Sequence, residues 1–353
     1  MKIFLNTAII LLLLTVSVFA GNYFPDTTDY KTLICDFHMH TVFSDGLVWP
    51  TVRVDEAERE GIDMIVISDH VEYQPHKDDI PTNHNRPFEI VKERAREKNV
   101  LLVRAAEITR STPPGHYNAI YLNDINPLDT PEFLDSIEGA NKQSAFVFWN
   151  HHEWKGKEKG DWKEVQTTMY DNGWLHGMEV ANGRVYYPNA HKWCLEKNMT
   201  LIGNSDIHEP SIHYNYIADK HRTLTLVFAK ERTVESIKEA LKARRTVAWY
   251  NNSLIGSKDT LAPLFDSLVS VAKAHCVKDG VAFFEVENKG LIDLELTALG
   301  KTSPKSMSIP AQSSKIFKTR LPEDGKPAKL RYSVTNMLAM PEEGLQVELV
   351  VSP

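Results

Sequence analysis

Residues 33–46 read LICDFHMHTVFSDG, an apolar run that leads into two histidines two positions apart and then into an acidic turn. Eight more short apolar runs follow as far as about Tyr250, and amphipathic stretches with a helical period separate several of them, as at residues 50–61 and 233–245. This alternation is typical of a mainly parallel α/β domain. We therefore expect a (β/α) barrel over residues 28–260.

The sequence changes character after about Ala262. Short alternating segments, separated by Gly, Pro and Asn turns, replace the helical period. This pattern predicts an antiparallel β-sandwich of Ig-like type over residues 263–353. None of the candidate ligands described below falls in this segment, so we expect the domain to be accessory to the chemistry.

The composition is that of a globular protein with two domains. The chain has 353 residues, of which 42% are hydrophobic and 25% are charged, and this length allows one large α/β domain and a smaller companion. A net charge of -7 and a pI near 6.1 provide no overall basic field. We therefore expect no tight nucleic-acid binding. The sequence carries no signal for a particular oligomeric state.

The first twenty residues have the features of a signal peptide. Lys2 precedes an apolar run, and Val18-Phe19-Ala20 provides a cleavage site of the small-residue type. Thr15 interrupts the apolar stretch, which is too short for a membrane anchor. We therefore expect cleavage after residue 20, export to the periplasm or the exterior, and no membrane span in the mature chain.

Histidines and carboxylates recur at or just beyond the ends of the apolar runs. The nine candidate metal ligands are His38, His40, Asp45, His70, Glu107, His116, His151, Asp206 and His208. Burying so many such groups is costly unless cations compensate them. Imidazole and carboxylate without Cys suit zinc, manganese or iron, and nine ligands are too many for one or two open sites. We therefore expect sites for up to three divalent metal ions, of which two or three are bound, at the barrel mouth, where the carboxyl ends of the strands converge.

The charge of such a centre indicates what it would bind. Three divalent ions outweigh the three carboxylates Asp45, Glu107 and Asp206, so the site would attract an anion. Phosphoryl oxygens that bridge two metals, attacked by hydroxide that a metal has generated, fit that charge.

The order of these motifs resembles the Polymerase and Histidinol Phosphatase (PHP) domain. It runs from the H-x-H of residues 38–40 through the SDG, DH, EIT, GH and NH segments to the D-x-H of residues 206–208. The resemblance spans residues 33–250 and implies a distorted seven-stranded (β/α) barrel with up to three metals, acting on phosphoesters. It also implies three ligand sets, which are His38, His40, Glu107 and Asp206, then Glu107, His116 and His151, and finally Asp45, His70 and His208.

Three residues are expected to be catalytic, namely Glu107, Asp206 and Arg184. Arg184 and Arg110 both follow strand ends. Each could bind phosphate through a bidentate contact or could instead form a surface ion pair.

Neighbouring side chains are expected to support the site. His152 should face away from the ligand His151, because adjacent residues of a strand point to opposite sides. Asp69 should orient a ligand or cap a turn. An aromatic rim for a ring or a sugar is one interpretation of several aromatic residues, and packing between the domains is the other. These residues are Trp149, Trp154, Trp162, Tyr186, Tyr187, Tyr214 and Tyr216.

The preferred interpretation is an exported metal-dependent phosphoesterase. Its substrates would be small-molecule phosphate monoesters or diesters, attacked by a metal-bound hydroxide at a trinuclear site. One alternative is a metallohydrolase that cleaves an amide, a lactone or another ester. The other is a metal-stabilised binding scaffold without catalysis.

Overall fold

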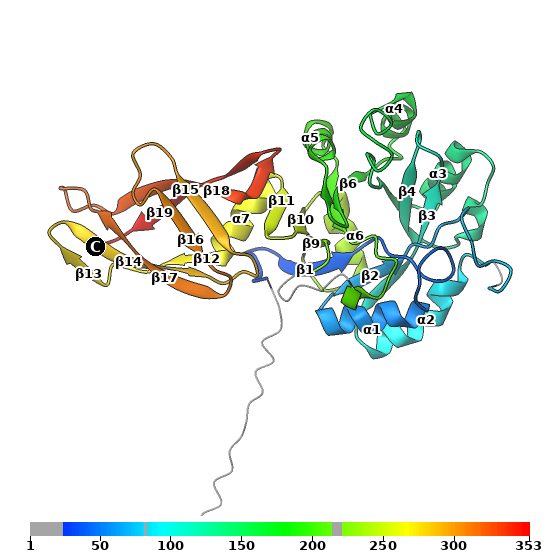
Figure 1. Cartoon of the computed structure of the whole chain (residues 1–353), viewed down its shortest axis with the longest axis horizontal. Coiled ribbons are helices and arrows are strands. Elements are labelled where there is room, and N and C mark those ends of the chain that lie inside the picture. Colours follow the sequence, from blue (N-terminus) through cyan, green and yellow to red (C-terminus); the bar gives the residue numbers. More distant parts are fainter. Residues whose placement is uncertain (1–23, 81–82, 214–220) are drawn as a thin grey trace, which may run out of the picture.

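The computed structural model describes residues 24–80, 83–213 and 221–353, which form an α/β barrel followed by a β-rich domain (Figure 1). Both parts of the predicted fold class are confirmed. The predicted signal peptide, Tyr214 and Tyr216 lie outside the described residues. In the described ranges, no helix is both long enough and apolar enough to cross a membrane.

Seven strands form the barrel wall. They are hydrogen-bonded in the order β1 (Lys31–Asp36), β2 (Met64–Ile67), β3 (Leu101–Thr109), β4 (His116–Leu122), β5 (Phe146–Trp149), β6 (Gly177–Asn182) and β8 (Thr200–Asn204). The wall closes just beyond the carboxyl ends of β1 and β8. There Met39 and Ile207 form a parallel bridge, and the His40 backbone N–H donates to the Ile207 carbonyl over 3.0 Å.

Strand β4 is the irregular member of the barrel. It runs antiparallel to both neighbours, pairing Thr109 of β3 with His116 and Trp149 of β5 with Tyr117. The amino end of β4 therefore lies beside the carboxyl end of β3. His116, the first residue of its strand, consequently reaches the same mouth as ligands that follow their strands.

Within the part of the barrel that the structure describes, six helices cover the wall, and short 3-10 turns and a small hairpin accompany them. The helices are α1 (Pro50–Glu60), α2 (Arg86–Glu97), α3 (Phe133–Lys142), α4 (Glu164–Asp171), α5 (Pro188–Lys197) and α6 (Val234–Lys242). The 3-10 turns are η1 (Asn126–Leu128) and η2 (Ser211–His213), and β7 (Val185–Tyr186) pairs back on β6. Capping residues mark the ends of two of these helices. At the start of α6, the Thr233 hydroxyl accepts a hydrogen bond from the Ser236 N–H, and at the end of α1, Gly61 adopts a left-handed backbone with φ 71°.

The C-terminal domain consists of two antiparallel sheets. One contains β12 (Val269–Val271), β13 (Cys276–Lys278), β14 (Val281–Asn288) and β17 (Ser313–Arg320), and the other contains β15 (Leu294–Ala298), β16 (Ser306–Ile309), β18 (Ala328–Met340) and β19 (Glu343–Val351). Burial alternates residue by residue along β14, as expected for a strand with one face on a core. A helix, α7 (Lys258–Leu268), runs through the expected boundary at residue 263, so the strands of this domain begin at Val269.

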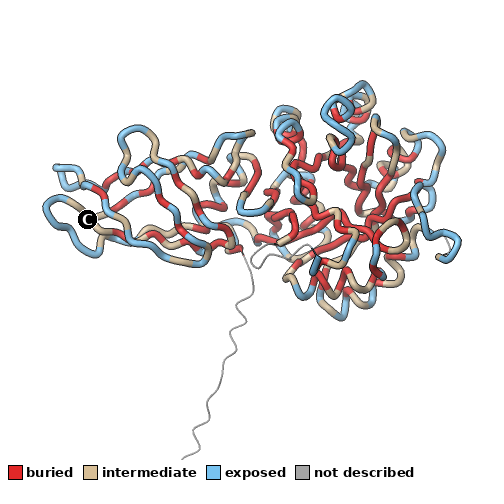
Figure 2. The backbone as a smooth tube through the Cα atoms, viewed as in Figure 1, coloured by how far each residue is buried: buried red, intermediate tan, exposed pale blue. Residues whose placement is uncertain are grey.

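A continuous sheet connects the two domains. Strand β9 (Leu224–Ala229) pairs antiparallel with β1, and β10 (Thr246–Tyr250) and β11 (Ser253–Gly256) follow it. Strand β11 then pairs in parallel with β18 of the C-terminal domain through Leu254 and Met337. Figure 2 shows buried backbone both in the barrel wall and across this junction.

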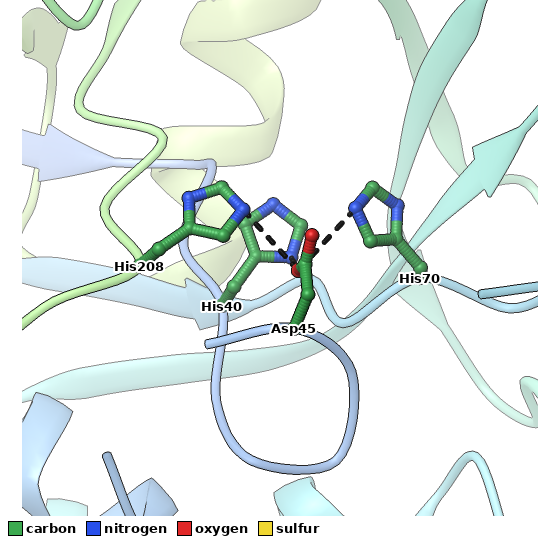
Figure 3. Close-up of side chains that lie close together, drawn as sticks. All are labelled: His40, Asp45, His70 and His208. Carbon is green, nitrogen blue, oxygen red and sulfur yellow. Dashed lines mark ion pairs between the residues drawn. The ribbon is translucent and has the colours of Figure 1, made fainter. Parts of the chain in front are cut away.

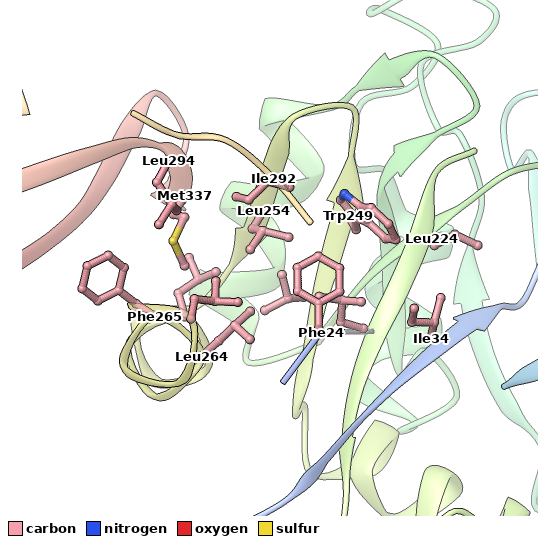
Figure 4. Packing of buried hydrophobic residues seen from close by; sticks show 14 of the residues in the cluster. Phe24, Ile34, Leu224, Trp249, Leu254, Leu264, Phe265, Ile292, Leu294 and Met337 are labelled. Carbon is pink, nitrogen blue, oxygen red and sulfur yellow. The ribbon is translucent and has the colours of Figure 1, made fainter. Parts of the chain in front are cut away.

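One apolar cluster spans the connection between the domains and is called the seam below (Figure 4). Its labelled members are Phe24, Ile34, Leu224, Trp249, Leu254, Leu264, Phe265, Ile292, Leu294 and Met337. Because these residues come from both domains, the C-terminal domain is packed as part of the same core, although it carries none of the candidate ligands.

Candidate metal centre

The extension of β1 places His38 and His40 on the side of the chain that faces the barrel mouth. Phe37 and Met39 alternate with them and are fully buried in apolar clusters. The extension of β8 lies alongside, because the Asp206 N–H donates to the His38 carbonyl over 2.9 Å. Asp206 has a left-handed backbone with φ 52°, an uncommon conformation for a residue other than glycine.

Four predicted ligands converge at this point. The Nε2 atoms of His38 and His40 lie 3.0 Å apart, and each lies 3.3 Å from Glu107 Oε2. Asp206 Oδ1 lies 3.2 Å from the first nitrogen and 3.1 Å from the second. Two ligand atoms on one tetrahedral zinc ion lie about 3.3 Å apart, because the usual distance from zinc to nitrogen or oxygen is about 2.0 Å. The five distances are therefore short enough for these residues to share a metal ion.

The second oxygen of Glu107 points to another pair of predicted ligands. Glu107 Oε1 lies 3.0 Å from His116 Nδ1 and 3.4 Å from His151 Nε2. Glu107 is fully buried on β3, between the two groups. Its two oxygens are thus arranged to bridge two ions.

Asp45 is the centre of the third group, with His70 and His208 flanking it (Figure 3). Asp45 Oδ1 lies 3.2 Å from His208 Nε2 and 3.5 Å from His70 Nε2. His40 Nδ1 also approaches Asp45 Oδ1, at 3.7 Å, so His40 lies between the first and the third group. All nine predicted ligands accordingly lie at one mouth.

The electrostatics of the centre are those of coupled, buried ions. Burial alone would raise the pKa of Glu107, but the neighbouring His70 and His38 charges outweigh it and hold that pKa well below its ordinary value. Burial would lower the pKa of His70, but the Glu107 and Asp45 carboxylates raise it to about 10. Without a metal, protons on the imidazoles must therefore neutralise the carboxylates.

The residues fit divalent metal ions. Asp45 Oδ1, Asp206 Oδ1 and His151 Nδ1 are buried and have no hydrogen-bond partner within the described residues. Unsatisfied buried groups of this kind are costly, and coordination to a cation removes the cost for the two carboxylate oxygens. The donors are imidazole and carboxylate, as zinc, manganese and iron accept.

Asp69 holds the loop that carries Asp45. Its carboxylate accepts from the Thr41 N–H at 2.7 Å, the Thr41 hydroxyl at 2.6 Å and the Ser44 hydroxyl at 2.7 Å. Gly46 closes the same loop so tightly that an added Cβ would lie 2.5 Å from the His40 carbonyl carbon. Asp69 therefore acts on the site by fixing the backbone of this turn.

Sequence reasoning missed Glu179, a fully buried carboxylate on β6. Its Oε1 accepts from His38 Nδ1 at 2.8 Å, and its Oε2 accepts from the His151 N–H at 2.9 Å. The first contact leaves His38 Nε2 free to face a metal, as outer carboxylates do in metal sites. The only sequence signal was an acidic residue within the apolar run of residues 177–183.

The two predicted phosphate-binding arginines and His152 lie outside the ligand clusters. Arg184 is exposed on the turn between β6 and β7, outside the lining of the pocket at the metal centre. Arg110 pairs with Glu72 and donates to the Thr130 carbonyl over 2.7 Å, which is the ion-pair alternative. His152 lies outside the ligand clusters and packs against the rings of Trp149, Trp193 and Tyr187.

A pocket of about 240 Å³ opens at the centre. It is lined by Asp45, His70, Glu107, His116, His151, Trp154, Asn182, Tyr187, Asp206 and His208. Of the predicted rim residues that the structure describes, only Trp154 and Tyr187 line this pocket. Trp149 and Trp162 instead pack with Trp193 beneath the mouth.

Comparison with known proteins gives the family. A family model described as an Ig-like domain matches residues 269–350. A solved two-domain protein from Bacteroides vulgatus, containing a predicted PHP-like metal-dependent phosphoesterase, is 40% identical with a TM-score of 0.89. The alignment covers 93% of this chain and 97% of that one. No curated protein matches the chain.

A more distant structure is also similar in part. A candidate metal-dependent phosphoesterase from Bifidobacterium adolescentis is 14% identical over 60% of this chain and 96% of its own, with a TM-score of 0.41. On the strength of the Bacteroides vulgatus relative, the chain belongs to the PHP-like family with a C-terminal Ig-like domain.

Proposed function

We propose that this protein hydrolyses small phosphate esters at a centre of two or three divalent metal ions in the barrel mouth. The observation that carries the proposal is the sharing of Glu107, whose two oxygens face two separate ligand groups beside an open pocket. Adjacent divalent ions suit a phosphoryl group, because its oxygens can bridge them. Membership of a family with a predicted phosphoesterase member supports the same reaction class.

The chain's own residues would prepare the site in several ways. Ions held there would supply a water nucleophile that is deprotonated near neutral pH and would offset charge on the phosphoryl oxygens. Glu107 and Asp206 would hold the ions, and Glu179 would fix the tautomer of His38. The His208 Nδ1–H donates to the Asp206 carbonyl over 2.8 Å, which leaves Nε2 to face the centre. Arg184, two residues beyond Asn182, stays a predicted phosphate contact.

The test is a substrate panel on purified, metal-loaded protein. We expect release of inorganic phosphate from aryl and alkyl phosphates, with little cleavage of matched carboxylic esters and lactones. The variant Glu107→Gln, prepared in parallel, controls for contaminating phosphatases because it should lose the activity. Cleavage of carboxylic esters or lactones alone would favour the other metallohydrolase, and metal binding without any turnover would favour the scaffold.

We also propose that the enzyme acts outside the cytoplasm. The support is the sequence of residues 1–20 alone, with its basic start, apolar run and cleavage site. A phosphoesterase in that location would scavenge phosphate from small esters. Fractionation of cells that express the full chain, with sequencing of the new amino terminus, tests this, and uncleaved protein in the cytoplasm would contradict it.

A further inference from the structure

The pocket contains a surface that the metal centre does not use. Three of its ten lining residues lie outside the ligand set, namely Trp154, Asn182 and Tyr187. The Asn182 amide already has a partner within the protein, because its Nδ2 donates a hydrogen bond to Glu179 Oε2 over 2.7 Å. Tyr187 is 4% exposed and packs on His152. Trp154, by contrast, is 47% exposed, so it alone of the three offers a large open apolar surface to a ligand.

Trp154 stands directly beside two metal ligands. The centroid of its ring lies 5.2 Å from that of His116 and 5.8 Å from that of His151. A group stacked on the indole would therefore lie beside the residues that would hold the phosphoryl group. Single exposed aromatic residues are ordinary, but one in contact with two ligands inside the same pocket is placed to bind the rest of the substrate.

The loop that presents Trp154 is anchored without a ligand. The Trp154 N–H donates to the His151 carbonyl over 3.0 Å, and Glu153 Oε1 accepts from Asn189 Nδ2 of α5 at 2.9 Å. At the end of the loop, the Gly160 backbone packs against the His152 backbone so closely that an added Cβ would lie 2.4 Å from the His152 carbonyl oxygen. An indole held in place beforehand binds a ring with less loss of conformational freedom than a mobile one.

Other contacts indicate which chemistry the indole accepts. Lys155 Nζ lies 3.8 Å from the centroid of the Trp154 ring, so the exposed ammonium makes a cation–π contact with one face of the indole. A planar ring would cover more of that face than an exposed ammonium does. Tyr73, which is 52% exposed, is a second aromatic residue beside a predicted ligand, with its ring centroid 5.9 Å from that of His70.

Resting on the phosphoesterase function above, we propose that Trp154 binds the leaving group and that the preferred substrates are phosphoesters whose alcohol carries a planar aromatic ring. The phosphoryl group binds at the metal centre and the ring stacks on the indole. Ringless alkyl phosphates bind through the phosphoryl group alone, so they bind more weakly.

Binding of non-hydrolysable phosphonates to the metal-loaded full chain tests the proposal without turnover. Titration calorimetry would compare phenylphosphonate, cyclohexylphosphonate and methylphosphonate. We expect the wild type to bind phenylphosphonate at least about tenfold more tightly than methylphosphonate, with cyclohexylphosphonate between them. The variant Trp154→Ala should lose at least about fivefold for phenylphosphonate and less than about twofold for methylphosphonate, whereas Trp154→Phe should retain most of the preference.

Trp49 provides a matched control. It is also 47% exposed, but its ring centroid lies 5.5 Å from that of Phe43, and it does not line the pocket. Trp49→Ala should leave all three affinities unchanged. Equal affinities in the wild type, equal losses for all ligands in Trp154→Ala, or no binding of any phosphonate would overturn the proposal.

Turnover separates this inference from the function on which it rests. We expect the ratio of kcat/KM for phenyl phosphate to that for glycerol 2-phosphate to fall in Trp154→Ala, mainly through KM. An unchanged ratio in an active enzyme would refute the role of Trp154 alone. A wild type that prefers phenylphosphonate but cleaves no phosphate ester would refute the phosphoesterase function and leave the ring-binding role supported.

Discussion

The inner ligands of the barrel mouth and the residues of the seam are both buried but have opposite chemistry. At the mouth, His38, His40 and Glu107 are fully buried ionisable groups, and Glu107 Oε2 lies 3.3 Å from the Nε2 atom of each histidine. At the seam, Leu254 and Leu264 are also fully buried, but they contact apolar neighbours. Burial stabilises the seam directly, whereas at the mouth burial costs free energy that a bound cation must offset. Substitutions at the mouth should therefore affect function before fold, and substitutions at the seam should affect fold before function.

The largest expected effect follows from Glu107→Gln. The substitution keeps the shape of the side chain but removes the charge that faces two ligand groups. Loss of an outer-shell partner typically costs 10- to 100-fold, so loss of this bridging ligand should lower kcat/KM by more than about 100-fold. Circular dichroism should show a native fold. Retained activity at full metal content would mean that Glu107 is no ligand.

Removal of the metal should lower the melting temperature. Ions that bind only the folded chain stabilise it by mass action, about 4 kcal/mol at a thousandfold excess over Kd. Differential scanning fluorimetry before and after chelation measures the change, and elemental analysis should first find two or three ions per chain. Restoring the metal should restore the melting temperature. An identical melting temperature with and without bound ions would contradict the idea that the buried groups of the mouth, unlike those of the seam, need a cation to offset their cost.

Leu264→Ala should give the opposite result to Glu107→Gln. Leu264 is fully buried in the seam, so truncation should lower the free energy of unfolding by about 2–5 kcal/mol. Activity of the folded protein should stay within about twofold of the wild type. Leu134→Ala is the matched control, because Leu134 is 37% exposed on α3 and should cost less than about 1 kcal/mol. Urea denaturation measures the loss of stability, and turnover on the same samples measures the retained activity.

Two adjacent histidines sharpen the boundary of the mouth. His151 Nε2 lies 3.4 Å from Glu107 Oε1, whereas His152 faces Trp149 and Tyr187. Burial and the neighbouring His151 charge lower the pKa of His152 to about 3, so it is neutral at pH 7. His151→Ala should therefore lose about one ion per chain by elemental analysis and His152→Ala none. Equal losses would show that both histidines belong to the centre.

The smallest effect concerns pH and a buried histidine on a helix next to the seam. His191 is buried on α5, which packs against β18, and burial lowers its pKa from 6.5 to about 4. The unfolded chain binds this proton more readily, so its contribution is present above about pH 6.5 and is lost as pH falls toward 4. His191→Gln should remove about 1–3 kcal/mol of this pH dependence. Urea denaturation of the wild type and the variant at pH 7 and pH 4.5 measures this. The same loss of unfolding free energy in both proteins between the two pH values would contradict the prediction.

Much of the candidate site could be read from local pattern. Residues two apart on a strand face one side, so the H-x-H of residues 38–40 predicts two imidazoles that point together. The same rule predicts that His152 leaves the site, and the structure places it outside the ligand clusters. Local pattern did not identify Glu179, because a single acidic residue within an apolar run does not reveal the partner that it will contact.

Three features could be predicted from the amino-acid sequence alone, because each depends on residues close together in the chain: the strand and helix periods, the change of pattern near Ala262 and the order of the nine ligand candidates. Three other features follow from tertiary contacts. These are the antiparallel direction of β4 that brings His116 to the mouth, the Glu179 contact with His38, and the pairing of β11 with β18. Each depends on contacts between segments far apart in sequence, whose relative direction and register are set by packing and closure of the whole sheet rather than by any local pattern.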